Sequence, residues 1–160
     1  MELYLFRHGI AEDVQPGKRD ADRALLDQGR KKAADVVKAA RRGGLNPSLI
    51  VSSPYLRAFQ TAQVAADELG YQGEIVKIDT LVPHGSPESV WHELRAHRGE
   101  SAILLAGHEP LLSSLTAYLL AAPALRVEMK KAAMVRIDIE NFGPTPHGTL
   151  RWMITPKLTG

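Results

Sequence analysis

The chain has 160 residues, a formal net charge of +2 and no cysteine. Its length is that of one domain, so we expect a single folded unit over residues 1–160. Hydrophobic residues make up 44% and charged residues 24% of the sequence, which excludes a disordered, collagenous or coiled-coil chain. The lack of cysteine excludes thiolate nucleophiles, disulfides and thiolate-bound metals, and the small net charge gives no indication of nucleic acid binding.

Neither a membrane span nor a secretion signal is predicted. The longest apolar runs, at residues 102–106 and 114–122, fall well short of the roughly 20 residues that a spanning helix needs. The N-terminus carries the acidic Glu2 and reaches Arg7 after few apolar positions, so it lacks the basic start and apolar centre of a signal peptide. We therefore expect a cytoplasmic protein that does not bind membranes.

Strands and helices alternate along most of the sequence. In chain order we predict a strand at residues 2–6, a helix at 27–42, a strand at 49–51, a helix at 54–69, a strand at 75–78, a helix at 88–98, a strand at 102–106, a helix at 110–120, and strands at 134–139 and 149–155. Asp27, Ser53 and Ser86 are predicted helix caps, and residues 11–23 are predicted to form a loop. The alternation predicts an α/β fold, a three-layer α/β/α sandwich with a mostly parallel central sheet.

Polar residues follow three of the predicted strands. Arg7-His8 follows the first strand, Ser52-Ser53-Pro54 with Arg57 follows the second, and Gly107-His108 follows the fourth. In open α/β sheets, ligands bind beyond the carboxyl ends of the strands. Arg57 falls at the start of its helix, where free N–H groups and the helix dipole favour an anion. The sequence therefore predicts that these side chains meet in one anion site.

Phosphate is the anion that this set of side chains suits best. Two arginines can hold three phosphoryl oxygens through bidentate hydrogen bonds. A neutral imidazole beside the phosphorus can attack it and carry the phosphoryl group until water removes it. On the residues alone, either His8 or His108 can be the attacking group while the other holds an oxygen. Because the arginines supply the positive field, the reaction requires no metal or other cofactor.

Five segments, spread in order over nearly the whole chain, resemble those of a known family. They are Leu-Phe-Arg-His-Gly at residues 5–9, Asp20-x-x-Arg23-x-Leu25-x-x-x-Gly29, Ser-Ser-Pro-Tyr-Leu-Arg-Ala-Phe-Gln-Thr-Ala at residues 52–62, Leu81-x-Pro83-x-Gly85 and Gly-His-Glu-Pro at residues 107–110. The chain thus resembles the histidine phosphatase superfamily in its phosphoglycerate-mutase-like branch, and most closely the small SixA-type phosphohistidine phosphatases. This resemblance implies a phosphoglycerate-mutase-like fold and a phosphorylated nucleophile, His8, in a phosphate pocket completed by Arg7, Arg57 and His108.

The proton donor is the part of the family pattern that this sequence does not match. Larger relatives place a carboxylate after the third strand, whereas residues 81–85 here read Leu-Val-Pro-His-Gly and contain none. Four residues are candidates for the general acid, namely Asp20, His84, Glu88 and Glu109. The sequence does not choose among them.

The weak match at the proton donor bears on the substrate. An alkoxide leaving from a sugar phosphate needs a strong acid, whereas an imidazole, with an ordinary pKa of about 6.5, departs with less help. The chain is also too short for the inserts that cover small substrates in larger relatives, so a protein surface can approach the site. We therefore expect a phosphorylated partner protein of the histidine phosphotransfer type, in a signalling or transport pathway.

Two alternatives remain open for the function. One is a phosphatase for small phosphoesters such as sugar or nucleotide phosphates, which needs an effective acid; a mutase, which needs a closed site, is disfavoured. The other is a non-catalytic phosphate-binding module, against which the complete set of four site residues argues.

Several other polar patterns are assigned no function. His92-Glu93 and His97 resemble a zinc-protease motif, but the second histidine comes one residue late and leaves the shared helix face. No metal site is therefore expected. The basic runs at residues 30–32, 41–42 and 130–131 can attract an acidic partner, but a solvated surface explains them better.

Overall fold

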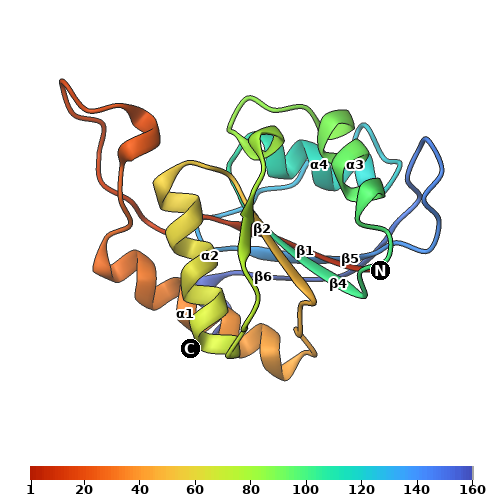
Figure 1. The fold of residues 1–160 in the computed structure, drawn as a ribbon, viewed down its shortest axis with the longest axis horizontal. Coiled ribbons are helices and arrows are strands. Elements are labelled where there is room, and N and C mark those ends of the chain that lie inside the picture. The colour runs from red at the N-terminus through yellow and green to blue at the C-terminus, as the bar shows by residue number, and fades with distance from the viewer. Residues whose placement is uncertain (160) are drawn as a thin grey trace.

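The computed structural model describes residues 1–159, and its middle layer is a six-stranded sheet of order β3-β2-β4-β1-β5-β6 (Figure 1). The strands are β1 (Glu2–Arg7), β2 (Leu49–Ser52), β3 (Ile75–Lys77), β4 (Ala102–Gly107), β5 (Met134–Asp138) and β6 (Thr149–Ile154). The first four in this spatial order pair in parallel, and β5 and β6 add to β1 as antiparallel strands. The prediction of a mostly parallel sheet is confirmed.

Four helices complete the three layers. They are α1 (Asp27–Arg42), α2 (Leu56–Leu69), α3 (Pro87–Ala96) and α4 (Leu111–Leu119), with short 3-10 helices η1 (Asp20–Asp22), η2 (Asp79–Leu81) and η3 (Pro156–Leu158). The pair α1 and α2 lies on one face of the sheet, and the pair α3 and α4 lies on the other (Figure 1). None of the helices in the described part of the chain has the length and apolar character that a bilayer crossing requires.

The central strand β1 is buried on both faces because its side chains alternate between two cores. Leu3 and Leu5 pack with α3 and α4, while Tyr4 and Phe6 pack with α1 and α2, and all four are fully buried. Successive side chains of a strand point to opposite faces, so a strand covered on both faces requires an unbroken apolar run of this kind. The carboxyl end of β1 therefore opens at the middle of one sheet edge, where ligands bind in this architecture.

Two predicted helix caps, Asp27 and Ser53, are wrong. Asp27 is the first residue of α1 but makes no capping hydrogen bond, and the preceding Leu26 occupies the cap position. The second helix begins at Leu56, after the predicted cap Ser53, because the buried Ser53 hydroxyl is engaged by a histidine ring instead. At the third helix, the Ser86 side chain accepts a hydrogen bond from the Ser89 N–H at 3.2 Å, which confirms that cap.

Two glycines bring α1 into contact with the loop that follows β1. A Cβ atom on Gly29 would lie 2.1 Å from the carbonyl oxygen of Ile10, and one on Gly9 would lie 2.7 Å from the carbonyl oxygen of Gly29. Such distances are well inside van der Waals contact, so only glycine permits this approach. The Leu26 N–H also donates to the Ile10 carbonyl at 2.9 Å. The backbone next to His8 is thus held against a rigid helix.

Candidate active site

The four residues predicted to form one anion site come from two strand ends and one helix start. Arg7, the last residue of β1, pairs with Gly107 at the end of β4, and the His8 N–H donates to the Gly107 carbonyl at 3.0 Å. This pairing sets the rings of His8 and His108 side by side, with centroids 5.2 Å apart. Arg57, in the first turn of α2, reaches the His8 ring with its Nε 3.4 Å from Nε2.

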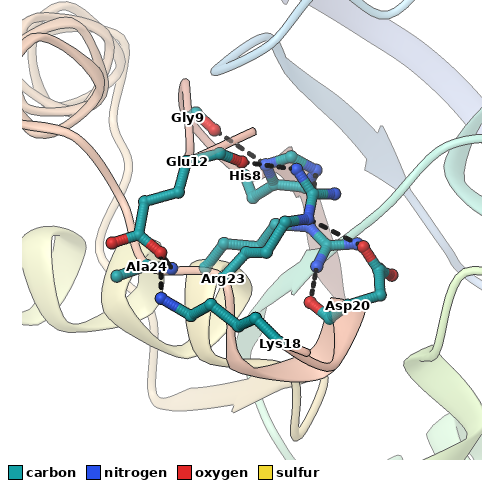
Figure 2. Close-up of polar contacts among 8 residues, drawn as sticks. His8, Gly9, Glu12, Lys18, Asp20, Arg23 and Ala24 are labelled. Carbon is teal, nitrogen blue, oxygen red and sulfur yellow. Dashed lines mark hydrogen bonds and ion pairs between the residues drawn. The ribbon is translucent and has the colours of Figure 1, made fainter. Parts of the chain in front are cut away.

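The imidazole of His8 is held in one tautomer. Its Nδ1 lies 2.7 Å from the carbonyl oxygen of Gly9, and because a carbonyl only accepts, Nδ1 must carry the proton (Figure 2). The lone pair is therefore on Nε2, which faces Arg57. Thr61 fixes this arrangement, since its Oγ1 accepts from the Gly9 N–H at 3.1 Å and donates to the Arg57 carbonyl at 2.8 Å.

Both histidines are uncharged at neutral pH. Burial lowers the pKa of His8 to about 3, and the positive charges of Arg57, Arg7 and Lys131 act in the same direction, against the opposing effect of the Gly9 carbonyl. Burial likewise lowers the pKa of His108 to about 2, with further lowering by His8 and Arg57. A neutral imidazole with a free Nε2 lone pair is the form that can act as a nucleophile.

The lowered pKa values predict loss of stability in acid. An unfolded histidine binds its proton near pH 6.5 but the folded His8 only near pH 3, so between these limits protons favour the unfolded chain. We expect the free energy of unfolding to fall as the pH drops through this window, by an amount on the order of a few kcal/mol from His8. Urea unfolding followed by circular dichroism at several pH values measures this slope.

Two histidine variants test whether His8 causes this loss of stability in acid. In His8→Asn the amide can still donate to the Gly9 carbonyl, and the fall in stability between pH 6.5 and 3 should become shallower than in the wild type. His92→Asn, at an exposed position on α3, should keep the wild-type slope. Equal slopes in wild type and His8→Asn would contradict the assignment.

An ion-pair network connects Arg57 to the segment between β1 and α1. One Nη atom of Arg57 donates to the Asp20 carbonyl at 2.8 Å and the other to the Asp20 carboxylate at 3.1 Å. Arg23 donates to the same carboxylate through Nε at 2.8 Å and to the Glu12 carbonyl through Nη1 at 2.7 Å (Figure 2). Glu12 in turn binds Lys18 and the Ala24 N–H (Figure 2). The segment is thus fastened beside Arg57.

This network makes Asp20 a poor proton donor. Burial by itself would raise the pKa of the Asp20 carboxyl, but hydrogen bonds and positive charge from Arg23 and Arg57 outweigh it and lower the pKa. The carboxyl is therefore ionised at neutral pH. Of the four candidate acids, Asp20 is the one that contacts a predicted site residue directly.

The three other candidate acids make no hydrogen bond to the four site residues in the part of the chain described. Glu109 follows His108 and lies close enough to Arg7 to act on its charge, but its Oε1 accepts from the Ser113 N–H at 2.8 Å, in the first turns of α4. His84 and Glu88 are exposed, between η2 and the first turn of α3. None of the three is thus held against the His8 ring.

Two nitrogen atoms of the site are buried without a hydrogen-bond partner among residues 1–159. They are Nε of Arg7, whose Nη1 donates to the Met129 carbonyl at 2.6 Å, and Nδ1 of His108. His108 Nε2 lies 2.8 Å from the Ser53 hydroxyl, and that oxygen accepts the Tyr55 N–H at 3.2 Å. Because buried polar groups are nearly always paired, these two nitrogens fit the oxygens of a bound anion.

Sequence reasoning places Ser53 among the side chains of the anion site but gives its hydroxyl the wrong role, and it misses Thr61 altogether. The sequence predicts a helix cap at Ser53, whereas the residue is buried at the end of β2. Thr61 lies on the buried face of α2 with Ala58, Ala62 and Ala65. A hydroxyl within a stripe of small apolar residues is the signal that identifies such a residue, since a buried hydroxyl needs partners.

Comparisons with known proteins identify the family of this chain. Residues 3–81 match the model of the histidine phosphatase superfamily, branch 1. An uncharacterized protein of Picosynechococcus sp. is 38% identical over 113 residues, which cover 69% of this chain and 67% of that protein. The phosphohistidine phosphatase SixA of Escherichia coli is 25% identical over 159 residues, which cover 98% of this chain and 94% of SixA.

A solved structure extends the likeness to the fold. The structure of the protein histidine phosphatase SixA complexed with tungstate matches this chain with a TM-score of 0.87, at 24% identity and over 98% of each chain. The predicted three-layer fold of the phosphoglycerate-mutase-like type is thereby confirmed. From the family match, the relatives and the fold together, the chain belongs to the histidine phosphatase superfamily and is a phosphatase.

Proposed function

We propose that this phosphatase hydrolyses phosphohistidine on a partner protein through a covalent phospho-His8 intermediate. The observation that carries the choice of substrate is the state of Asp20, whose carboxylate is ionised and held by Arg23 and Arg57. An ionised carboxylate cannot protonate a departing alkoxide, whereas imidazole is a better leaving group and needs less assistance. The name of the Escherichia coli relative, phosphohistidine phosphatase SixA, supports the same substrate class.

In the first step, the Nε2 lone pair of neutral His8 attacks the phosphorus and a new N–P bond forms. The substrate ring takes up one proton from solvent on its other nitrogen as its N–P bond breaks, so the electron pair of that bond leaves on a neutral imidazole. Arg7, Arg57 and Nδ1 of His108 donate hydrogen bonds to the phosphoryl oxygens, where negative charge must be stabilised. The similar protein SixA was solved as a complex with tungstate, itself an oxyanion, which supports anion binding by this fold.

In the second step, water attacks phospho-His8 and the N–P bond to the enzyme breaks. Inorganic phosphate leaves, the electron pair returns to Nε2 and one proton goes to solvent, which balances the proton consumed earlier. The Gly9 carbonyl keeps the proton on Nδ1 in both steps, so His8 returns to its starting tautomer.

A comparison of substrates tests this proposal. We expect kcat/KM for a phosphorylated histidine phosphotransfer protein to exceed that for sugar phosphates and nucleotides by about a hundredfold or more, because the esters lack an acid catalyst. Release of inorganic phosphate measures the rate with the phosphoprotein, the sugar phosphates and the nucleotides. Hydrolysis of an aryl phosphate in the presence of a chelator shows whether the enzyme turns over at all. Preference for the esters would overturn the substrate, and absence of any turnover would indicate a phosphate-binding module.

The variant Asp20→Asn tests whether Asp20 acts as a proton donor. The amide keeps an oxygen for Arg23 and Arg57 but has no proton-transfer function, so phosphohistidine turnover should change by no more than a few-fold. A large loss of ester turnover in this variant would mean that Asp20 acts as an acid and that esters are substrates.

A further inference from the structure

A strongly basic pocket adjoins the phosphate site and takes no part in the proposed chemistry. Its cavity has a volume of about 620 Å³, and the residues that line it include Arg7, Lys32, Lys130, Lys131 and Lys157 but no carboxylate. The whole chain has a net charge of only +2, so five cations in one cavity are a local concentration of charge. We call these five residues the basic pocket.

The basic pocket is assembled from segments that are far apart in the sequence. Lys32 lies on α1, Lys130 and Lys131 lie in the segment before β5, and Lys157 lies in η3, which packs against α1. Arg7 at the end of β1 lines the cavity and also belongs to the phosphate site, so the two are continuous. The positive charge of Lys131 contributes to lowering the pKa of His8, so the pocket lies within electrostatic reach of the nucleophile.

The lysines of the basic pocket are available to a partner. Lys32, Lys131 and Lys157 are exposed and form no ion pair with any of residues 1–159. Lys130 is paired with Glu128 at 2.5 Å, but both side chains are exposed and such surface pairs contribute little. Mutual repulsion among these cations is relieved when carboxylates from another molecule approach.

We propose that the basic pocket docks acidic side chains that flank the phosphohistidine of the partner protein. The inference rests on the proposed protein substrate. Four of its five cations are lysines, which are flexible point charges rather than the planar forks that hold a second phosphate group bidentately. Exposed lysines from separate segments create a broad positive field, which suits a complementary acidic surface and steers its approach.

A pair of charge reversals tests the docking site. We compare Lys32→Glu/Lys157→Glu with Arg42→Glu/Arg98→Glu, in which two exposed arginines outside the pocket change the net charge equally. The substrates are a phosphorylated histidine phosphotransfer protein with acidic residues beside its phosphohistidine, and an aryl phosphate. For the pocket variant we expect KM for the phosphoprotein to rise about tenfold with kcat unchanged, while the control variant and the aryl phosphate show no change.

A second experiment changes the partner protein instead of the enzyme. When the flanking carboxylates of the phosphoprotein are replaced by amides, KM with the wild-type enzyme should rise, and the pocket variant should add no further increase. Added salt should raise KM for the wild-type pair and have less effect on the pocket variant.

The outcomes separate this inference from the proposed function. Hydrolysis of the phosphoprotein with no effect of the pocket variant would overturn the docking site alone. Equal losses in the pocket and control variants would also overturn it, because net charge then explains the result. A wild-type enzyme that hydrolyses aryl phosphate but not the phosphoprotein would overturn both the proposed substrate and the docking site. A pocket variant that loses only the turnover of small bisphosphates would overturn the docking site and assign the pocket to a second phosphate group.

Discussion

Replacement of His8 by alanine is expected to lower turnover of both a phosphohistidine protein and an aryl phosphate by at least about a thousandfold. The expectation follows from the proposed mechanism, in which Nε2 of His8 forms the only covalent bond between enzyme and phosphorus. No neighbouring group replaces it, because Nε2 of His108 is engaged by the Ser53 hydroxyl at 2.8 Å. Steady-state release of inorganic phosphate measures the loss, and circular dichroism verifies that the variant is folded.

Trapping the intermediate distinguishes a nucleophile from a residue that only binds phosphate. Rapid quenching of the wild type in alkali, where phosphohistidine is stable, should give a protein whose mass has increased by one phosphoryl group, located at His8 by peptide mapping. The matched control His147→Ala removes an exposed histidine outside the site and should retain both the label and the activity. A label at His108 instead, or activity that survives in His8→Ala, would refute the assignment.

Most of the site can be predicted from the sequence because local patterns place its residues at strand ends or at a helix start. Arg7, His8 and His108 follow strands whose apolar runs are unmistakable, and parallel strands present their carboxyl ends at one sheet edge. Arg57 is placed by the first turn of α2 in the same way. Because these signals are local in the sequence, they do not require knowledge of the packing.

The parts that the sequence did not predict depend on contacts between distant segments. Ser53 reads as a helix cap locally, but its hydroxyl is taken by His108, which lies 55 positions away. The tautomer of His8 depends on a turn that brings the Gly9 carbonyl back to its own ring, and Thr61 holds that turn from another helix. The basic pocket likewise arises from four segments whose charges are dispersed along the chain.

Removal of the Arg57 guanidinium is expected to lower kcat/KM by about a hundredfold to a thousandfold, because charge-assisted hydrogen bonds to the phosphoryl oxygens are lost in a buried site. Only 4% of its side chain is exposed, so solvent screens its charge weakly. The variant Arg57→Ala tests this by steady-state kinetics with aryl phosphate, and Arg41→Ala, an exposed arginine of α1, is the control.

The variant Arg57→Lys separates charge from geometry. A guanidinium reaches the His8 ring with Nε while its two Nη atoms hold the carbonyl and carboxylate of Asp20, and a lysine ammonium cannot span both. We therefore expect Arg57→Lys to recover only part of the activity, and the segment from Glu12 to Arg23 to become more accessible to protease in both variants. Full activity in Arg57→Lys would show that a positive charge alone suffices, and that the bonds to Asp20 serve the fold rather than the reaction.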